Sequence, residues 1–84
     1  MIRYTVVWHE DSKNQLAQSW IDAPVRAAVT EAADAIDAYL AIDADRKGTE
    51  VEGGLRELVI PPLRVLYGVS EPDRLVKIVH LETV

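Results

Sequence analysis

Two apolar runs on either side of a Pro-Pro pair constrain the fold of this chain more than any other feature. Leu, Val and Ile dominate residues 55–60 and 63–69, and Pro61 and Pro62 lie between them. Proline has no backbone N–H to donate, so the pair should interrupt a strand ladder and leave two strands joined by a turn. This stretch therefore predicts a β-hairpin.

Each strand of the predicted hairpin contains one arginine among apolar neighbours, Arg56 in the first and Arg64 in the second. Strand alternation puts each side chain on a defined face, and neighbouring strands could place both on the same face. Two guanidinium groups there would form a site for phosphate or carboxylate. The alternative is that the arginines pair with acids such as Glu50, Glu52 or Glu57 and are merely solvated.

The residues before the hairpin predict one strand and two helices. Residues 2–8 are rich in β-branched and aromatic side chains and place apolar residues on one face with a period of two, which is typical of a strand. A helix from about Ser12 to Ile21 follows, with Trp20 as its expected anchor in the core. Pro24 favours the first turn of a second helix. The apolar stripe of that helix consists of Val25, Val29, Ala32, Ile36 and Leu40.

Residues 43–54 are polar and punctuated by glycine, as expected for a loop between the helices and the sheet. After the hairpin, a turn at residues 70–73 leads to a last apolar strand over residues 75–81. The order β-α-α-β-β-β predicts a single α+β domain over residues 1–84, with an antiparallel sheet packed against a helical hairpin. The first strand is expected to join this sheet, and periodicity does not identify its neighbour.

Composition excludes several classes of protein. The 84 residues contain no cysteine, which excludes disulfides and thiolate metal sites. No run approaches the roughly 20 apolar residues needed to span a bilayer. No metal-ligand cluster and no phosphate-binding glycine loop is found, and His9 and His80 are too far apart for a spacing motif. We expect a cytoplasmic protein without membrane partner, metal or cofactor, in which His9 caps the first helix or faces solvent.

The chain is acidic, with a net charge of −5. Residues 1–54 contain ten acids and five bases, whereas residues 55–84 contain four of each. Phosphate repels such a protein at long range, so general affinity for nucleic acid is not expected. A local basic face could still bind a few phosphates.

The hairpin also resembles a known family. Gly54-Leu55-Arg56-Glu57-Leu58 followed by Pro62-Leu63-Arg64-Val65-Leu66-Tyr67 looks like the second half of RelE/ParE-type toxins, the small bacterial proteins of toxin–antitoxin pairs that include plasmid stabilisation proteins. Tyr4-Thr5-Val6-Val7-Trp8 resembles the opening strand of that family, so the likeness covers nearly the whole chain. The resemblance implies the RelE/ParE-like fold and a cognate antitoxin as partner.

The C-terminal end departs from the pattern of the RNA-cleaving members of the family. Arg64 matches the position of their phosphate-contacting arginine. Those members also carry an arginine, histidine or tyrosine for proton transfer at the end of the last strand. Here Thr83 and Val84 cannot act as acid or base near neutral pH, and Glu82 would repel phosphate. His80 lies slightly early, and only a register shift would bring it to the site.

Three hypotheses follow from the resemblance and its departures. The first is a ParE-like toxin that binds a target protein, in that subfamily DNA gyrase. The second is a RelE-like, ribosome-dependent mRNA endonuclease in which Arg56, Arg64 and His80 stabilise the scissile phosphate and move protons. The third is a non-toxic interaction module that keeps the fold. Whether the chain is an enzyme therefore stays open.

All three hypotheses require a surface for a partner protein. An antitoxin of this kind typically covers a sheet edge or groove with an added strand or a helix. Leu58, Ile60 and Val76 are candidate apolar anchors for such a segment. The alternative is that these three residues belong to the ordinary core.

Overall fold

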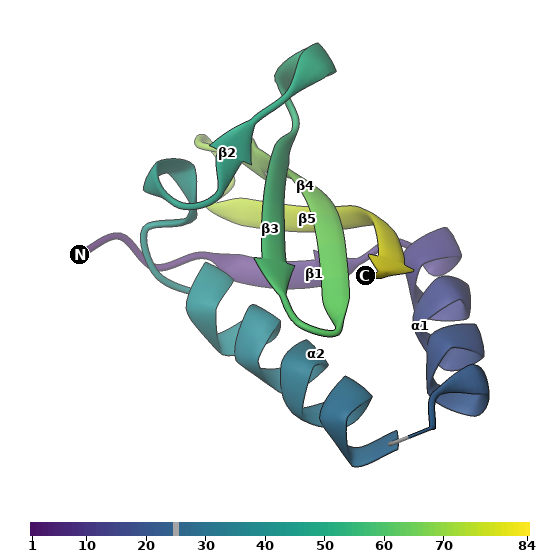
Figure 1. Ribbon diagram of the computed structural model, residues 1–84. Helices are drawn as coiled ribbons and strands as arrows, with labels where there is room; N and C mark the ends of the chain where they lie inside the picture. Colours follow the sequence, from purple (N-terminus) through teal and green to yellow (C-terminus); the bar gives the residue numbers. More distant parts are fainter. Residues whose placement is uncertain (25) are drawn as a thin grey trace.

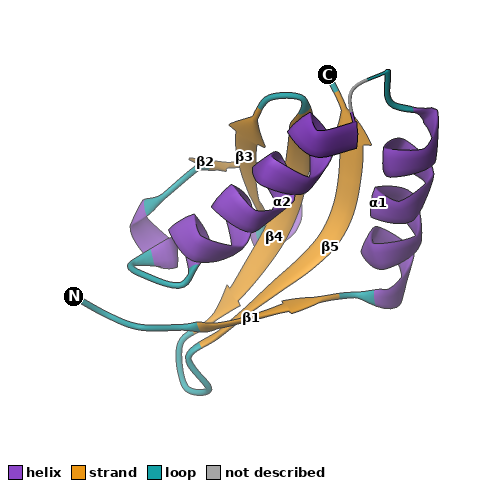
Figure 2. Ribbon diagram, turned by 90° about the horizontal axis from the view of Figure 1, so that it is seen from below, coloured by secondary structure: helices purple, strands orange, loops and turns teal. Residues whose placement is uncertain are grey.

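The computed structural model describes residues 1–24 and 26–84 and shows an α+β fold, as the order of elements predicts. Five strands form one sheet in the order β1-β5-β4-β3-β2, and the two helices lie on one side of it (Figures 1 and 2). No helix of this described part is long and apolar enough to cross a membrane. The elements are β1 (Thr5–Trp8), α1 (Glu10–Asp22), α2 (Arg26–Leu40), β2 (Thr49–Glu50), β3 (Arg56–Ile60), β4 (Leu63–Ser70) and β5 (Leu75–Thr83).

The hairpin predicted around Pro61 and Pro62 is confirmed as β3 and β4, and β4 continues into β5 as an antiparallel meander. The first strand joins the sheet at its edge and runs parallel to β5, with Thr5 opposite Leu75 and Trp8 opposite Ile78. The sheet is thus mixed: β3, β4 and β5 form the expected antiparallel meander, and β1, whose neighbour the sequence left open, adds a parallel pairing. The expected loop over residues 43–54 contains the short strand β2 and two single 3₁₀ turns.

The core forms between the helices and one face of the sheet. Alternate residues of β4 point into it, and Leu63, Val65 and Tyr67 are completely buried. The predicted stripe of α2 is confirmed for its described members, while Val25 lies outside the described residues. The other fully or nearly buried apolar residues are Tyr4, Val29, Ala32, Ala33, Ile36, Leu40, Ala44, Val76, Ile78 and Leu81.

A bulge in β5 changes which residues face the core. Leu66 lies opposite His80 and Tyr67 lies opposite Ile78, so Val79 has no partner in β4. A bulge inserts one extra residue and shifts the alternation of the strand. Ile78 and Leu81 therefore both point into the core, and His80 turns to the face without helices.

Trp20 is not the core anchor that we expected, because 42% of its surface is exposed. The two helices diverge from their connection like the arms of a V (Figures 1 and 2). The N-terminal half of α1 is fixed to β5, where the Ser12 hydroxyl donates to the Ile78 carbonyl at 2.8 Å. The C-terminal half of α1 carries Trp20, which is partly exposed to solvent and lines a groove between the two helices.

Candidate functional site

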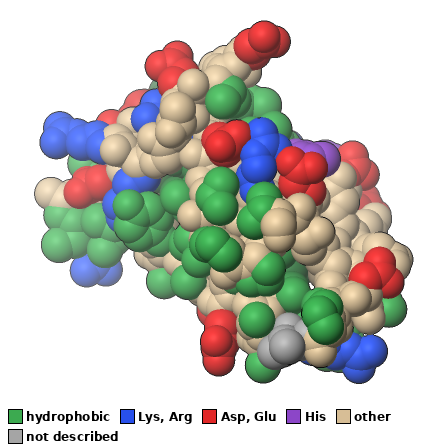
Figure 3. Space-filling view, viewed as in Figure 1, with side chains coloured by type: hydrophobic (Ala, Val, Ile, Leu, Met, Phe, Trp, Pro, Cys, Tyr) green, Lys and Arg blue, Asp and Glu red, His purple; other side chains and the backbone are tan. Residues whose placement is uncertain are grey.

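A cluster of charged side chains lies on the face of the sheet that the helices do not cover. It consists of Glu57 on β3, Arg64 on β4, and His80 and Glu82 on β5. Cross-strand pairing places Arg64 directly opposite Glu82, and Leu66 opposite both Glu57 and His80. Directly paired residues share a face, so all four side chains belong to one surface. Figure 3 shows acidic, basic and histidine side chains side by side on one face of the molecule. We call these four residues the open-face cluster.

Arg64 is held by two carboxylates. Its Nε donates to Glu57 Oε2 at 2.8 Å, its Nη2 lies 2.6 Å from the same oxygen, and its Nη1 donates to Glu82 Oε1. The hydrogen bonds that the guanidinium donates to Glu57, and then to Glu82, raise its pKa, although partial burial opposes this. The cluster without His80 carries one positive and two negative charges. A phosphate at Arg64 would therefore compete with two carboxylates that are already bound to the guanidinium.

Arg56 does not belong to the open-face cluster. It lies opposite Tyr67, whereas Arg64 lies opposite Val59, so the two arginines point to opposite faces of the sheet. Arg56 Nε donates to the Lys47 carbonyl at 2.6 Å, and the Tyr67 hydroxyl donates to the same oxygen at 2.6 Å. The expectation that both arginines could share a face is wrong. Arg64 lies opposite Val59, which is three residues after Arg56 on β3, and residues an odd number of positions apart on a strand point to opposite faces.

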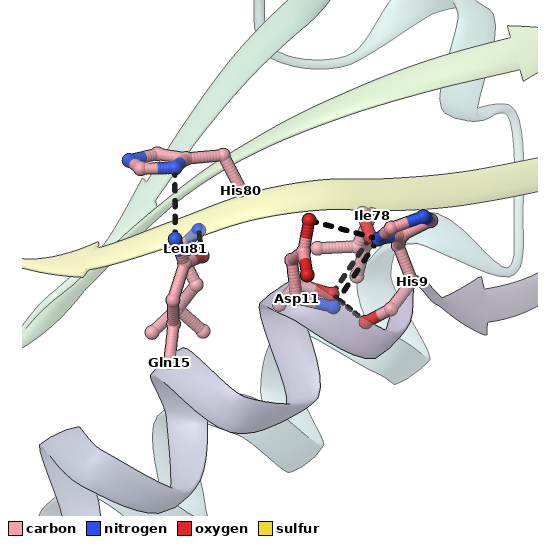
Figure 4. A network of polar contacts seen from close by, with 7 residues as sticks. His9, Asp11, Gln15, Ile78, His80 and Leu81 are labelled. Carbon is pink, nitrogen blue, oxygen red and sulfur yellow. Dashed lines mark hydrogen bonds and ion pairs between the residues drawn. The ribbon is translucent and has the colours of Figure 1, made fainter.

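Gln15 on α1 holds His80. The backbone N–H of Leu81 donates to Gln15 Oε1 at 2.8 Å, which fixes the orientation of the amide (Figure 4). The amide NH₂ then lies 3.2 Å from His80 Nδ1 and donates to it. His80 consequently carries its proton on Nε2 when it is neutral. From the sequence, Glu57 is a possible partner of the arginines and Glu82 a residue that would repel phosphate, and both carboxylates bind Arg64. Sequence reasoning missed Gln15, because only the placement of α1 brings it to His80.

His9 has the capping role that the sequence predicts. Its Nδ1 accepts a hydrogen bond from the Asp11 backbone N–H at 3.2 Å, in the first turn of α1 (Figure 4). This contact satisfies one of the amide groups that a helix N-terminus leaves without an internal partner. The ring also lies 3.7 Å from the Asp11 carboxylate. His9 therefore stabilises the start of α1 and does not reach the open-face cluster.

The three apolar residues considered as partner anchors lie in or against the core. Val76 is completely buried, and Leu58 and Ile60 are partly buried and pack against the core.

An apolar surface lies between the helices, where a groove of about 710 Å³ opens beside Trp20 and Ile21. We call it the interhelical groove. Its apolar lining is Trp8, Leu16, Ala17, Trp20, Ile21, Val29 and Ala33.

No protein-family model matches the chain, and no curated protein sequence matches it. Solved structures do match. The toxin–antitoxin complex RelBE2 from Mycobacterium tuberculosis aligns over 100% of this chain and 94% of the matched chain, with 20% identity and a TM-score of 0.77. The ParDE system of P. aeruginosa covers 100% and 99%, with 16% identity and a TM-score of 0.69.

The archaeal RelE–RelB complex from Pyrococcus horikoshii covers 99% of this chain and 96% of the matched chain, with 20% identity and a TM-score of 0.67. The similar structures thus include both RelE-type and ParE-type systems over nearly their full lengths. At these identities the likeness establishes the fold, which is that of the RelE/ParE toxins, and does not separate the two types.

Proposed function

We propose that this chain, which has the RelE/ParE fold, is the toxin of a bacterial type II toxin–antitoxin pair and is neutralised by a cognate antitoxin. The match in fold over the whole chain supports this proposal. Several of the matched structures are toxin–antitoxin complexes or systems, and this supports an antitoxin partner for the chain. Fold alone does not fix function, and the mechanism has to be argued from the site.

The state of Arg64 favours a ParE-like mechanism, in which the toxin binds a target protein such as DNA gyrase in the cytoplasm. Both Glu57 and Glu82 contact the guanidinium, and these carboxylates occupy donor positions that a phosphate would need. The net charge of −5 adds long-range repulsion of RNA. A target protein does not need these donor positions, because its surface can contact the open-face cluster while Arg64 stays bound to its carboxylates.

A RelE-like mRNA endonuclease is the second candidate, and one specific observation favours it. The open-face cluster combines a carboxylate, a guanidinium and a histidine with an Nε2–H on one surface. Such groups can serve as base, phosphate-stabilising cation and acid in RNA cleavage. This mechanism would use Arg64 and His80 together with Glu57, and it leaves out Arg56, which lies on the other face.

Two assays with the purified chain separate these mechanisms. We expect the chain to inhibit DNA supercoiling by gyrase, and we expect Arg64→Ala to change that inhibition little, since Arg64 is occupied within its own chain. In the second assay, with translating ribosomes, we expect the chain to leave the messenger RNA uncut. The matched control is Arg74→Ala, which removes a guanidinium from the exposed turn before β5.

Resistance of gyrase to the wild-type chain would contradict the ParE-like mechanism. Translation-dependent cuts in the message that disappear in both Arg64→Ala and His80→Ala would establish the nuclease instead. Intact messages and uninhibited gyrase together would support the non-toxic interaction module.

A further inference from the structure

The interhelical groove is an apolar surface between α1 and α2 that is open to solvent. Trp20 and Ile21 form a ridge on α1, with 42% and 56% of their surfaces exposed. Beside this ridge, the small residues Ala17 and Ala33 help to line the groove of about 710 Å³. Trp20 itself lines the groove, and the Arg26 guanidinium lies 4.6 Å from the centroid of its ring. The patch thus combines a large, partly exposed aromatic side chain with a hollow lined in part by small residues. Large exposed apolar patches of this kind mark interaction surfaces.

The two walls of the groove carry opposite charges. Lys13 lies on the α1 wall, and Asp34 and Asp37 lie on the α2 wall. None of the three forms an ion pair with another residue in the part of the chain that the structure describes. The groove therefore presents a basic edge and an acidic edge that are both free to meet complementary charges.

We propose that a second copy of this chain occupies the interhelical groove and forms a two-fold symmetric dimer. In such a dimer the same patch is used twice, so a contact from residue i to residue j is repeated from j to i. Trp20 of one copy enters the groove of the other. Lys13 of each copy then meets Asp34 and Asp37 of its partner.

The pattern of charge favours a second copy over an unrelated segment of single charge. A basic helix would complement Asp34 and Asp37 but would face Lys13 with like charge, and an acidic helix would do the reverse. Only a partner with both signs on opposite sides of an apolar ridge matches both walls, and this chain carries that arrangement itself. The groove lies on the helical side of the sheet, so the dimer leaves the open-face cluster exposed.

Sedimentation velocity from about 1 µM to about 500 µM tests the dimer, since this range covers Kd values typical of homodimers of modest affinity. We expect a concentration-dependent shift from monomer to dimer. Trp20→Gln should weaken the association by about tenfold or more, because the tryptophan supplies the central apolar contact. Tyr39→Gln is the matched control, since Tyr39 is similarly exposed at 45% on α2 but does not line the groove. Circular dichroism verifies that both variants fold.

A charge exchange tests the orientation of the two copies. Lys13→Glu makes both walls acidic, and Asp34→Lys with Asp37→Lys makes both walls basic, so each variant alone should sediment as a monomer. An equimolar mixture should form a mixed dimer, because every acidic wall then meets a basic wall.

A wild-type chain that stays monomeric over the whole range overturns the proposal and assigns the groove to another partner, such as a segment of the antitoxin. Dimers that persist in both charge variants, or a Trp20→Gln variant that dimerises like wild type, overturn it as well. These outcomes do not depend on toxicity, so they are separable from a failure of the proposed function.

Discussion

Single side chains stabilise backbone groups that the regular elements leave without partners. The Lys47 carbonyl, in the turn before β2, accepts hydrogen bonds from both the Tyr67 hydroxyl and Arg56 Nε. The next residue is Gly48, with φ of +66°, and a Cβ atom there would lie 2.4 Å from the Glu57 carbonyl oxygen. The turn can therefore approach the sheet closely only with glycine at this position.

Tyr67→Phe should lower the free energy of unfolding by about 1 kcal/mol. The ring stays in the core, but the Ala44 and Lys47 carbonyls lose the hydroxyl that donates to them. Urea denaturation measures this change, with the exposed Tyr39→Phe as a control that should change stability little. Equal effects of the two substitutions would show that the hydroxyl of Tyr67 does not stabilise the turn.

Asp43 gives the chain a defined response to acid. Its Oδ1 accepts a hydrogen bond from the Ile2 backbone N–H at 2.6 Å, and this bond lowers the pKa of the carboxyl below its ordinary value of 3.8, helped by the charges of the N-terminus, Arg46 and Lys47. A lowered pKa in the folded state stabilises the fold above the ordinary pKa. This contribution is lost as the pH falls through the lowered folded-state pKa.

Asp43→Asn should therefore make stability less dependent on pH between about pH 5 and about pH 2. Asparagine suits this position because residue 43 has φ of 51°, in the left-handed region that Asn tolerates. Thermal unfolding at a series of pH values measures the dependence. Identical slopes for the variant and the wild type would rule out Asp43 as a source of acid sensitivity.

Among the elements, α1 supplies a hydrogen-bond acceptor to the part of β5 that β1 does not pair with. Strand β1 pairs only with residues Leu75–Ile78 of β5. Beyond that point the chain has turned into α1, and the Gln15 side chain accepts from the Leu81 N–H at 2.8 Å. The helix thus provides a hydrogen-bond partner by a side chain where a longer β1 would have used its backbone. The same amide orients His80 on the other face.

Gln15→Ala should lower the free energy of unfolding by about 1–2 kcal/mol, because the Leu81 N–H loses its acceptor at a partly buried site. The Leu81 amide should also exchange its hydrogen faster. Gln18→Ala on the same helix is the matched control, since the Gln18 amide donates to the exposed Asp22 carboxylate. A Leu81 amide that exchanges at the wild-type rate in Gln15→Ala would contradict this role of α1.

The elements themselves could be predicted from sequence, but their mutual placement could not. Period-two alternation and the Pro-Pro pair indicate β3 and β4, and period 3.6 indicates the buried stripe of α2. These signals are local. The parallel pairing of β1, the bulge at Val79 and the exposure of Trp20 depend on contacts between residues far apart in the chain. The open-face cluster depends on the same contacts. The sequence suggested Arg64 and His80 and named Glu57 as a possible partner of the arginines, but it grouped Arg56 with them.

At the scale of the whole molecule, the sheet separates two surfaces with different chemistry. The open face carries a paired arginine, two glutamates and a histidine, while the helical side carries the apolar interhelical groove. The fold is that of the RelE/ParE toxins. In the proposed function the open face is left for a protein target, and in the proposed dimer the groove on the helical side holds a second copy.

The most direct test of the proposed toxin is its effect on growth. The chain is expressed from a tightly controlled promoter in a bacterial host, and growth is followed after induction beside cells that express Arg64→Ala. We predict growth arrest by the wild-type chain, and by Arg64→Ala as well if the target is a protein. Unimpaired growth, with the expressed chain present and folded by circular dichroism, would contradict the assignment of this protein as a toxin.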